Sequence, residues 1–69
     1  MSDTAESRVA AREAQLLAAE NGVQLYRVVD EIVPLRTWLK RHDMGALDER
    51  LHEAVKAAHD RIYPKGDEG

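Results

Sequence analysis

Residues 23–42, VQLYRVVDEIVPLRTWLKRH, decide the fold of this chain. Five apolar residues within them are separated alternately by three and four positions: Leu25, Val28, Ile32, Leu35 and Leu39. Because a helix turns by about 100° per residue, this spacing brings the five side chains onto one line. We therefore predict a helix over residues 23–42 whose apolar line faces the core.

Pro34 interrupts this predicted helix near its middle. Proline has no backbone N–H, and its ring crowds the carbonyl of Asp30, so a helix here either kinks or ends. The apolar line keeps its phase on both sides of Pro34, which favours a single helix kinked at Pro34. The alternative is a pair of helices that meet at Val33, because the residue before a proline disfavours helical angles.

The segment before this stretch also has a helical composition. Residues 4–20 are rich in Ala, Arg, Glu, Gln and Leu, and Asp3 and Glu6 have the spacing of a capping box. We predict a first helix over residues 4–20. We expect it to end before Gly22, since a glycine just after a helix can adopt the left-handed geometry that closes the last turn.

The segment after the central stretch predicts a third helix. Apolar residues recur at helical spacing over residues 46–63, and Pro64 stops the pattern. Gly45 is placed either to close the second helix or to open the third. The polar ends of the chain, residues 1–3 and 65–69, are expected to be disordered tails.

The composition predicts one small all-α domain over residues 1–69, a three-helix bundle. With 69 residues, no phenylalanine and few large aromatic side chains, the core must be small, so we expect the bundle to be completed by homodimerisation. The chain has no cysteine, which suits a reducing cytoplasm. Its net charge of −3 makes nucleic-acid binding an unfavoured expectation. The sequence lacks a run of about 18 apolar residues, so no membrane association is expected.

The apolar arc of the central helix is wider than one neighbouring helix can cover. Tyr26 and Val33 extend it on one flank and Trp38 on the other. Tryptophan and tyrosine are enriched at binding hot spots, although Trp38 can equally close one edge of the core. We predict that this face binds another protein or a second copy, and that nearby basic residues set the orientation. The candidate partner-binding residues are Tyr26, Val33, Arg36, Trp38, Lys40 and Arg41.

The same basic cluster supports an alternative function, a DNA-associated transcriptional regulator. The residues that would contact DNA are Arg36, Lys40, Arg41 and Arg50. Gly45 between two helices has the place of the turn in a helix-turn-helix motif. The comparison fails in detail, because Arg41 occupies a position that is usually small, and Asp48 and Glu49 would face phosphates.

Three residues of the predicted third helix are weak metal-ligand candidates. Glu49 and His52 have Glu-x-x-His spacing, and His59 follows seven residues later, so all three lean toward one side of a helix. A metal-binding helical oligomer is therefore a second alternative. A carboxylate-bridged metal site needs this motif twice, however, and we expect boundary residues here, with no bound metal or cofactor.

No pattern in the sequence predicts an enzyme. Cysteine is absent, the serines lie near the N-terminus, and neither a glycine-rich phosphate loop nor a nucleophile elbow is present. A chain this short also offers little room for a pocket of the usual few hundred cubic ångströms. The leading hypothesis is a small non-enzymatic adaptor or regulatory protein, of the kind encoded by phages and bacterial accessory genes.

Overall fold

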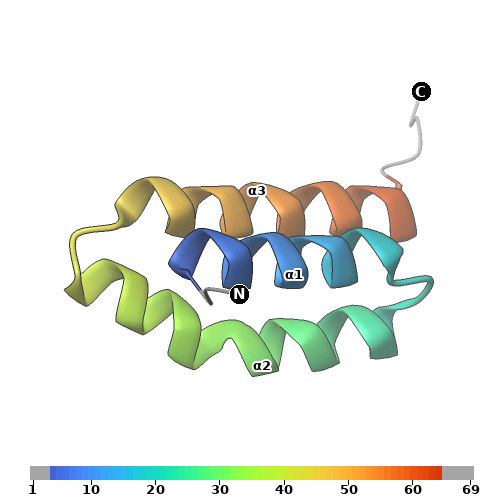
Figure 1. The fold of residues 1–69 in the computed structure, drawn as a ribbon. Helices are drawn as coiled ribbons and strands as arrows, with labels where there is room; N and C mark the ends of the chain where they lie inside the picture. Colours follow the sequence, from blue (N-terminus) through green and yellow to red (C-terminus); the bar gives the residue numbers. More distant parts are fainter. Residues whose placement is uncertain (1–3, 65–69) are drawn as a thin grey trace.

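The computed structural model describes residues 4–64 and arranges them as three α-helices, with the second antiparallel to the first and the third (Figure 1). The helices are α1, Ala5–Ala18, α2, Gly22–Arg41, and α3, Gly45–Ile62. They confirm the predicted all-α three-helix bundle, and every helix end lies within two residues of its predicted place. The predicted tails, residues 1–3 and 65–69, lie outside the described residues. No helix in the described part of the chain is long and apolar enough to cross a membrane.

The core lies along the axis between the three helices. Its buried apolar residues are Val9, Leu16, Ala19, Leu25, Ile32, Leu39, Leu51, Ala54 and Ala58. Three of the five predicted core positions on α2 are among them, and the other two, Val28 and Leu35, pack half-buried against them. α3 packs closely on both other helices, whereas α1 and α2 contact each other less. The seam between α1 and α2 is therefore the most open of the three.

α2 continues through Pro34 as a single helix, so the alternative of two helices meeting at Val33 is not adopted. Pro34 and Asp30 are both exposed. The carbonyl of Asp30, which has no N–H donor at Pro34, therefore faces solvent, where water can satisfy it. This location explains why a proline is tolerated inside the longest helix of the bundle.

The start of α1 differs from the prediction. Thr4 is the N-cap, and its hydroxyl accepts a hydrogen bond of 3.0 Å from the backbone N–H of Ser7. Thr4 therefore takes the N-cap position that the capping box assigned to Asp3, and Asp3 itself lies outside the described residues. Both residue types are good N-caps, and composition alone does not separate two candidates that are adjacent in the sequence.

The end of α1 also differs from the prediction, because Gly22 does not close it. α1 ends at Ala18, and Ala19 is extended, whereas Gly22 is the first residue of α2. The guanidinium of Arg61 on α3 donates hydrogen bonds to the carbonyl of Leu17, at 2.7 Å, and to that of Ala19. A long side chain from another helix thus satisfies the Leu17 carbonyl, which a glycine motif would have bonded, and the carbonyl of the C-cap Ala19 as well.

The connection between α2 and α3 is a Schellman motif. The backbone N–H of Met44 bonds the carbonyl of Leu39 at 2.8 Å, and that of Asp43 bonds the carbonyl of Lys40 at 3.3 Å. Asp43 holds the left-handed position, with φ of 63°, that glycine usually occupies. Gly45 opens α3, and Met44 packs half-buried against the core, which fixes the turn between the two helices.

Candidate functional site

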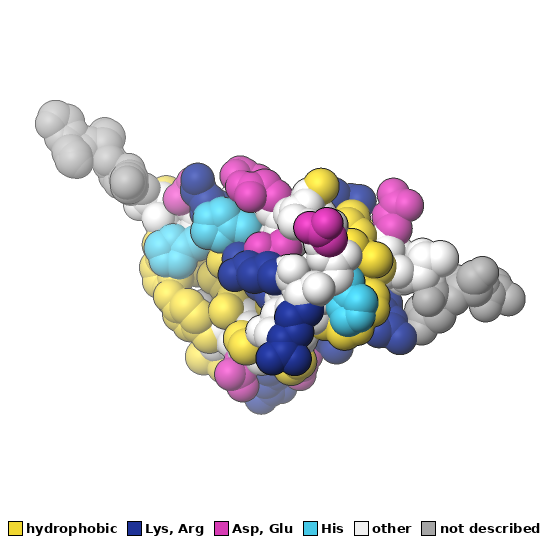
Figure 2. All heavy atoms as spheres, turned by 90° about the vertical axis from the view of Figure 1, so that its left-hand side faces the viewer, with side chains coloured by type: hydrophobic (Ala, Val, Ile, Leu, Met, Phe, Trp, Pro, Cys, Tyr) yellow, Lys and Arg dark blue, Asp and Glu magenta, His cyan; other side chains and the backbone are white. Residues whose placement is uncertain are grey.

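α2 carries a second line of side chains on the far side from the core. We call it the outer line; its members are all exposed, are separated alternately by three and four residues, and are Val23, Tyr26, Asp30, Val33, Thr37 and Lys40. Tyr26 and Val33 are each 54% exposed, and Val23 is 75% exposed. Two of the predicted anchors therefore lie on one exposed line, where apolar side chains face solvent. At the lower edge of Figure 2, where α2 lies, hydrophobic atoms are interspersed with acidic and basic ones.

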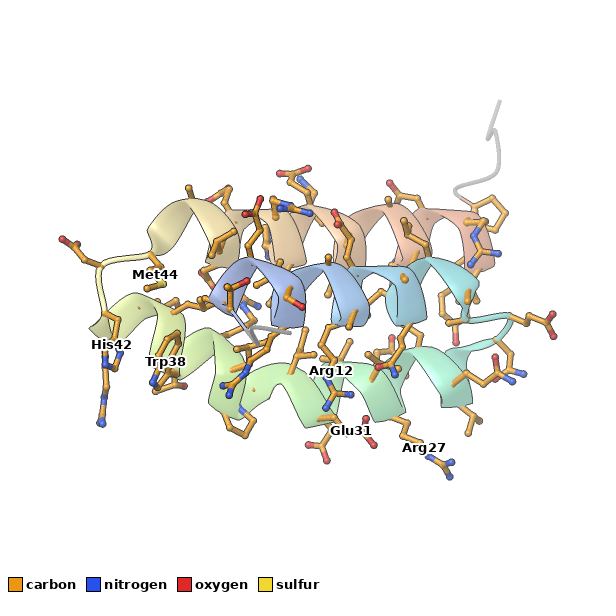
Figure 3. All side chains as sticks on the ribbon, viewed as in Figure 1. Arg12, Arg27, Glu31, Trp38, His42 and Met44 are labelled. Atoms are coloured by element: carbon orange, nitrogen blue, oxygen red, sulfur yellow. The ribbon has the colours of Figure 1, made fainter. Side chains whose placement is uncertain are left out.

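Trp38, the third predicted anchor, lies on a different flank of α2, at the seam with α1. It is 37% exposed, and its ring stacks on that of His42 with 4.3 Å between centroids (Figure 3). His42 is the C-cap of α2, and its Nδ1 lies 2.9 Å from the carbonyl oxygen of Trp38. The three predicted anchors therefore form two sets, Tyr26 with Val33 on the outer line and Trp38 at the α1 seam.

The seam between α1 and α2 forms an open groove of about 680 Å³. Its lining residues are Ser7, Arg8, Ala11, Arg12, Gln15, Glu31, Pro34, Leu35 and Trp38. An ion pair spans it, with Arg12 Nη1 3.0 Å from Glu31 Oε1 (Figure 3). Both partners are partly exposed, so this pair contributes at most about 1 kcal/mol and holds the two helices together weakly.

Arg36, a predicted partner-binding residue, is engaged inside the bundle. Its Nε donates a hydrogen bond of 2.7 Å to Asp48 Oδ1 on α3, and Nη2 lies 3.4 Å from Oδ2. Asp48 is 8% exposed. The hydrogen bond from Arg36 lowers the pKa of Asp48, against the opposing effect of burial, and it raises the pKa of Arg36. The pair therefore joins α2 to α3, and only Lys40 and Arg41 of the basic cluster are left exposed.

Arg50, the further residue of the DNA-binding alternative, is also engaged. Its Nη2 donates a hydrogen bond of 2.8 Å to Glu13 on α1, and its Nη1 lies 3.8 Å from Glu6. The hydrogen bond to Glu13 raises the pKa of Arg50. Two of the four cations proposed to meet phosphate, Arg36 and Arg50, thus already have carboxylate partners on neighbouring helices.

The metal-ligand candidates do not come together. Glu49, His52 and His59 are all exposed on α3, and the ring of His59 lies against that of Tyr63, with 5.0 Å between centroids. Among the residues that the structure describes, no group of three or more His, Cys, Asp or Glu side chains is placed to hold a metal ion. The spacing along one helix brings residues to one side, but ligands from a second helix are needed to complete a site.

Glu31 shows what the sequence did not reveal about the surface of α2. Its spacing from Arg27 favours an ion pair on the same helix, but Glu31 instead pairs with Arg12 of α1, and Arg27 points away from the bundle (Figure 3). Asp30 is a second residue of this surface that was not among the predicted site residues. It lies between Tyr26 and Val33 on the outer line, a position that the spacing alone could have indicated.

No protein-family model, curated protein or solved structure matches this chain. In the described part of the chain, two exposed surface features with apolar side chains are the outer line of α2 and the adjoining groove. The outer line is the stronger candidate for a contact surface, because its apolar side chains are more exposed than those of the groove.

Proposed function

We propose that this chain is a non-enzymatic protein-binding module, an adaptor or regulatory protein, whose contact surface is the outer line of α2. One observation carries the proposal: Val23, Tyr26 and Val33 lie on one line of one helix, each with at least half of its surface exposed. Scattered single apolar residues are normal on a protein surface, but a line of them along a helix is typical of helix-to-helix recognition.

The polar members of the outer line suit a contact surface as well. Asp30, Thr37 and Lys40 alternate with the apolar residues, so a bound helix would meet hydrogen-bonding and charged groups between the apolar contacts. Such groups add little affinity, but they determine which partner binds and in which direction. A partner would thus be held by Tyr26 and Val33 and oriented by Asp30 and Lys40.

The groove extends this surface on one side. Pro34 follows Val33 directly and is exposed, and one helical turn later Trp38 forms the edge of the groove. A partner that covers the outer line therefore also reaches the indole of Trp38, so this residue contributes from the rim. Trp38 is still an anchor in this proposal, but a peripheral one.

The DNA-binding alternative is less well supported by the geometry. Arg36 and Arg50 would have to leave carboxylate partners at 2.7 and 2.8 Å before they could meet phosphate. Lys40 and Arg41 remain, and two cations provide only a small electrostatic contribution to DNA binding.

A site-specific photo-crosslinker tests the proposal. A benzophenone amino acid is placed at Val33, and in a matched control at Glu53, which is also exposed but lies on α3. Both variants are irradiated in lysate of the source cells, and adducts are identified by mass spectrometry. We expect one defined protein adduct from position 33 and none from position 53. Equal labelling at both positions, or no adduct at position 33, would contradict the proposal.

A further inference from the structure

Two charges of the outer line, those of Asp30 and Lys40, lie at equal distances on either side of the level of Leu35 on α2. Asp30 precedes Leu35 by five residues and Lys40 follows it by five, so acid and base lie about 7.5 Å to either side along the helix. Arg41 stands next to Lys40 and adds a second positive charge at that end. Between the two ends, Val33 and Thr37 lie at equal offsets on the outer line. Acid and base therefore exchange places when the helix is reversed about the level of Leu35.

The charges of Asp30, Lys40 and Arg41 differ from those of the arginines that link neighbouring helices. Arg12, Arg36 and Arg50 each have a carboxylate partner within 3.0 Å on a neighbouring helix. Within residues 4–64, Asp30 and Arg41 form no ion pair, and Lys40 influences Asp48 only through its charge. The outer line thus presents opposite charges that the described part of the chain leaves unmatched.

We infer that a second copy of this chain packs its α2 antiparallel along the outer line, about a two-fold axis near Leu35; this inference rests on the proposed function. In an antiparallel helix pair with alternating three- and four-residue spacing, Asp30 faces Lys40 and Arg41 of the second copy. Val33 then faces Thr37 of the second copy. Because the interface is isologous, every such contact occurs twice.

The charge pattern favours a second copy over an unrelated protein. A two-fold interface requires that one patch complement itself, and the outer line from Asp30 to Lys40 does so only when the helices are antiparallel. Tyr26 then lies level with Met44, in the turn that follows the second copy's α2. A parallel pair would place Asp30 beside Asp30 and Lys40 beside Lys40, which repel. Since each copy contributes mainly one helix, the contact is at the small end of known interfaces, and we expect a dissociation constant in the micromolar range.

Charge reversal provides the test. Three variants are compared by sedimentation equilibrium at low salt: Asp30→Lys, the double variant Lys40→Asp with Arg41→Asp, and the combination of all three changes. We expect each of the first two to weaken self-association about tenfold or more, because two symmetric attractions become repulsions. The combination should restore association to within about threefold, since opposite charges again face each other.

Glu53→Lys is the matched control, because it makes the same charge reversal on the exposed side of α3. A melting curve for each variant confirms that the bundle is folded. The reversed residues form no ion pair in the described part of the chain, but Lys40→Asp also removes a positive charge that acts on Asp48, so the melting curve of this variant measures that effect separately. The inference is overturned if the parent chain is monomeric at every concentration, if Asp30→Lys behaves like Glu53→Lys, or if the combination fails to restore association. If the crosslinker at Val33 then captures a different protein, the proposed function survives without the second copy; if it captures nothing, both fail.

Discussion

α2 presents two lines of side chains that have the same spacing and opposite surroundings. On the inner line, Leu25, Ile32 and Leu39 are at most 1% exposed, whereas on the outer line Tyr26 and Val33 are each 54% exposed. Both lines contain large apolar residues, so hydrophobicity alone does not decide which of them becomes the core. The inner line is covered because α1 and α3 both lie on its side. The outer line stays exposed, because neither of the other two helices of the described bundle covers it.

The largest expected effect comes from two neighbouring residues that belong to different lines. Ile32→Ala should lower the free energy of unfolding by about 2–4 kcal/mol because it leaves a cavity in the core, whereas Val33→Ala should change it by less than about 0.5 kcal/mol. Urea unfolding at a concentration where the chain is monomeric measures both. Should Ile32→Ala not fold, Ile32→Val is the milder substitution, with an expected loss of about 1 kcal/mol. An equal loss at both positions would remove the distinction between the lines.

Trp38 lies between the two lines, so its substitution should cause an intermediate loss in the free energy of unfolding. With 37% of its surface exposed and its ring stacked on His42, Trp38→Ala should cost the monomer about 1–2 kcal/mol, less than the roughly 3–5 kcal/mol of a fully buried aromatic side chain. His42→Ala is the companion variant, which leaves the indole in place and removes the ring stacking together with the contact of His42 Nδ1 with the Trp38 carbonyl. A loss as large as that of a core residue would place Trp38 on the inner line, and no loss would place it on the outer one.

Asp48, which is buried in the bundle, and Asp30, which is exposed on the outer line, extend the comparison of covered and exposed surfaces to charged side chains. Asp48→Asn should cost about 1–2 kcal/mol at neutral pH, because it weakens a part-buried pair with Arg36, whereas Asp30→Asn should have almost no effect on the monomer. The pKa of Asp48 is lowered in the folded chain, so its contribution is complete above the ordinary value of 3.8 and is lost as the pH falls through the folded-state pKa below it. Unfolding curves from pH 7 to 2 should therefore converge for the parent chain and Asp48→Asn, and parallel curves would contradict this assignment.

The smallest expected effect is a gain in the free energy of unfolding from a substitution in the turn between α2 and α3. Asp43 has φ of 63°, so Asp43→Gly should raise the free energy of unfolding by about 0.5–1 kcal/mol, because glycine adopts this geometry without strain. Asp43→Ala removes the carboxylate and keeps the strained backbone, and it should stabilise nothing. A gain from alanine equal to that from glycine would show that charge rather than backbone geometry determines the effect.

The spacing of apolar residues predicted the three helices and the inner line of α2. The physical reason is that both depend on the helical period, and the spacing of apolar residues in a single sequence shows that period. The positions of Leu25, Ile32 and Leu39 in the core follow directly from it. The width of the apolar arc likewise predicted that Tyr26 and Val33 would extend beyond the core.

The period of one helix does not reveal which neighbour covers which flank. Whether Trp38 faces α1 or α3 depends on the direction in which the chain turns after α2, and residues distant in the sequence determine that. The pairs of Arg36 with Asp48 and of Arg61 with the end of α1 could not be predicted for the same reason. Each links two helices, so neither appears as a spacing within one.

The contact assigned to the outer line can be measured most directly with a spin label. The sequence has no cysteine, so Thr37→Cys introduces a single labelling site close to the proposed two-fold axis, and Glu53→Cys introduces one on the exposed side of α3. We expect strong dipolar coupling between labels at position 37 that grows with protein concentration, and much weaker coupling at position 53. Coupling that is absent at position 37, or no stronger there than at position 53, would contradict the assignment of the outer line as the contact surface.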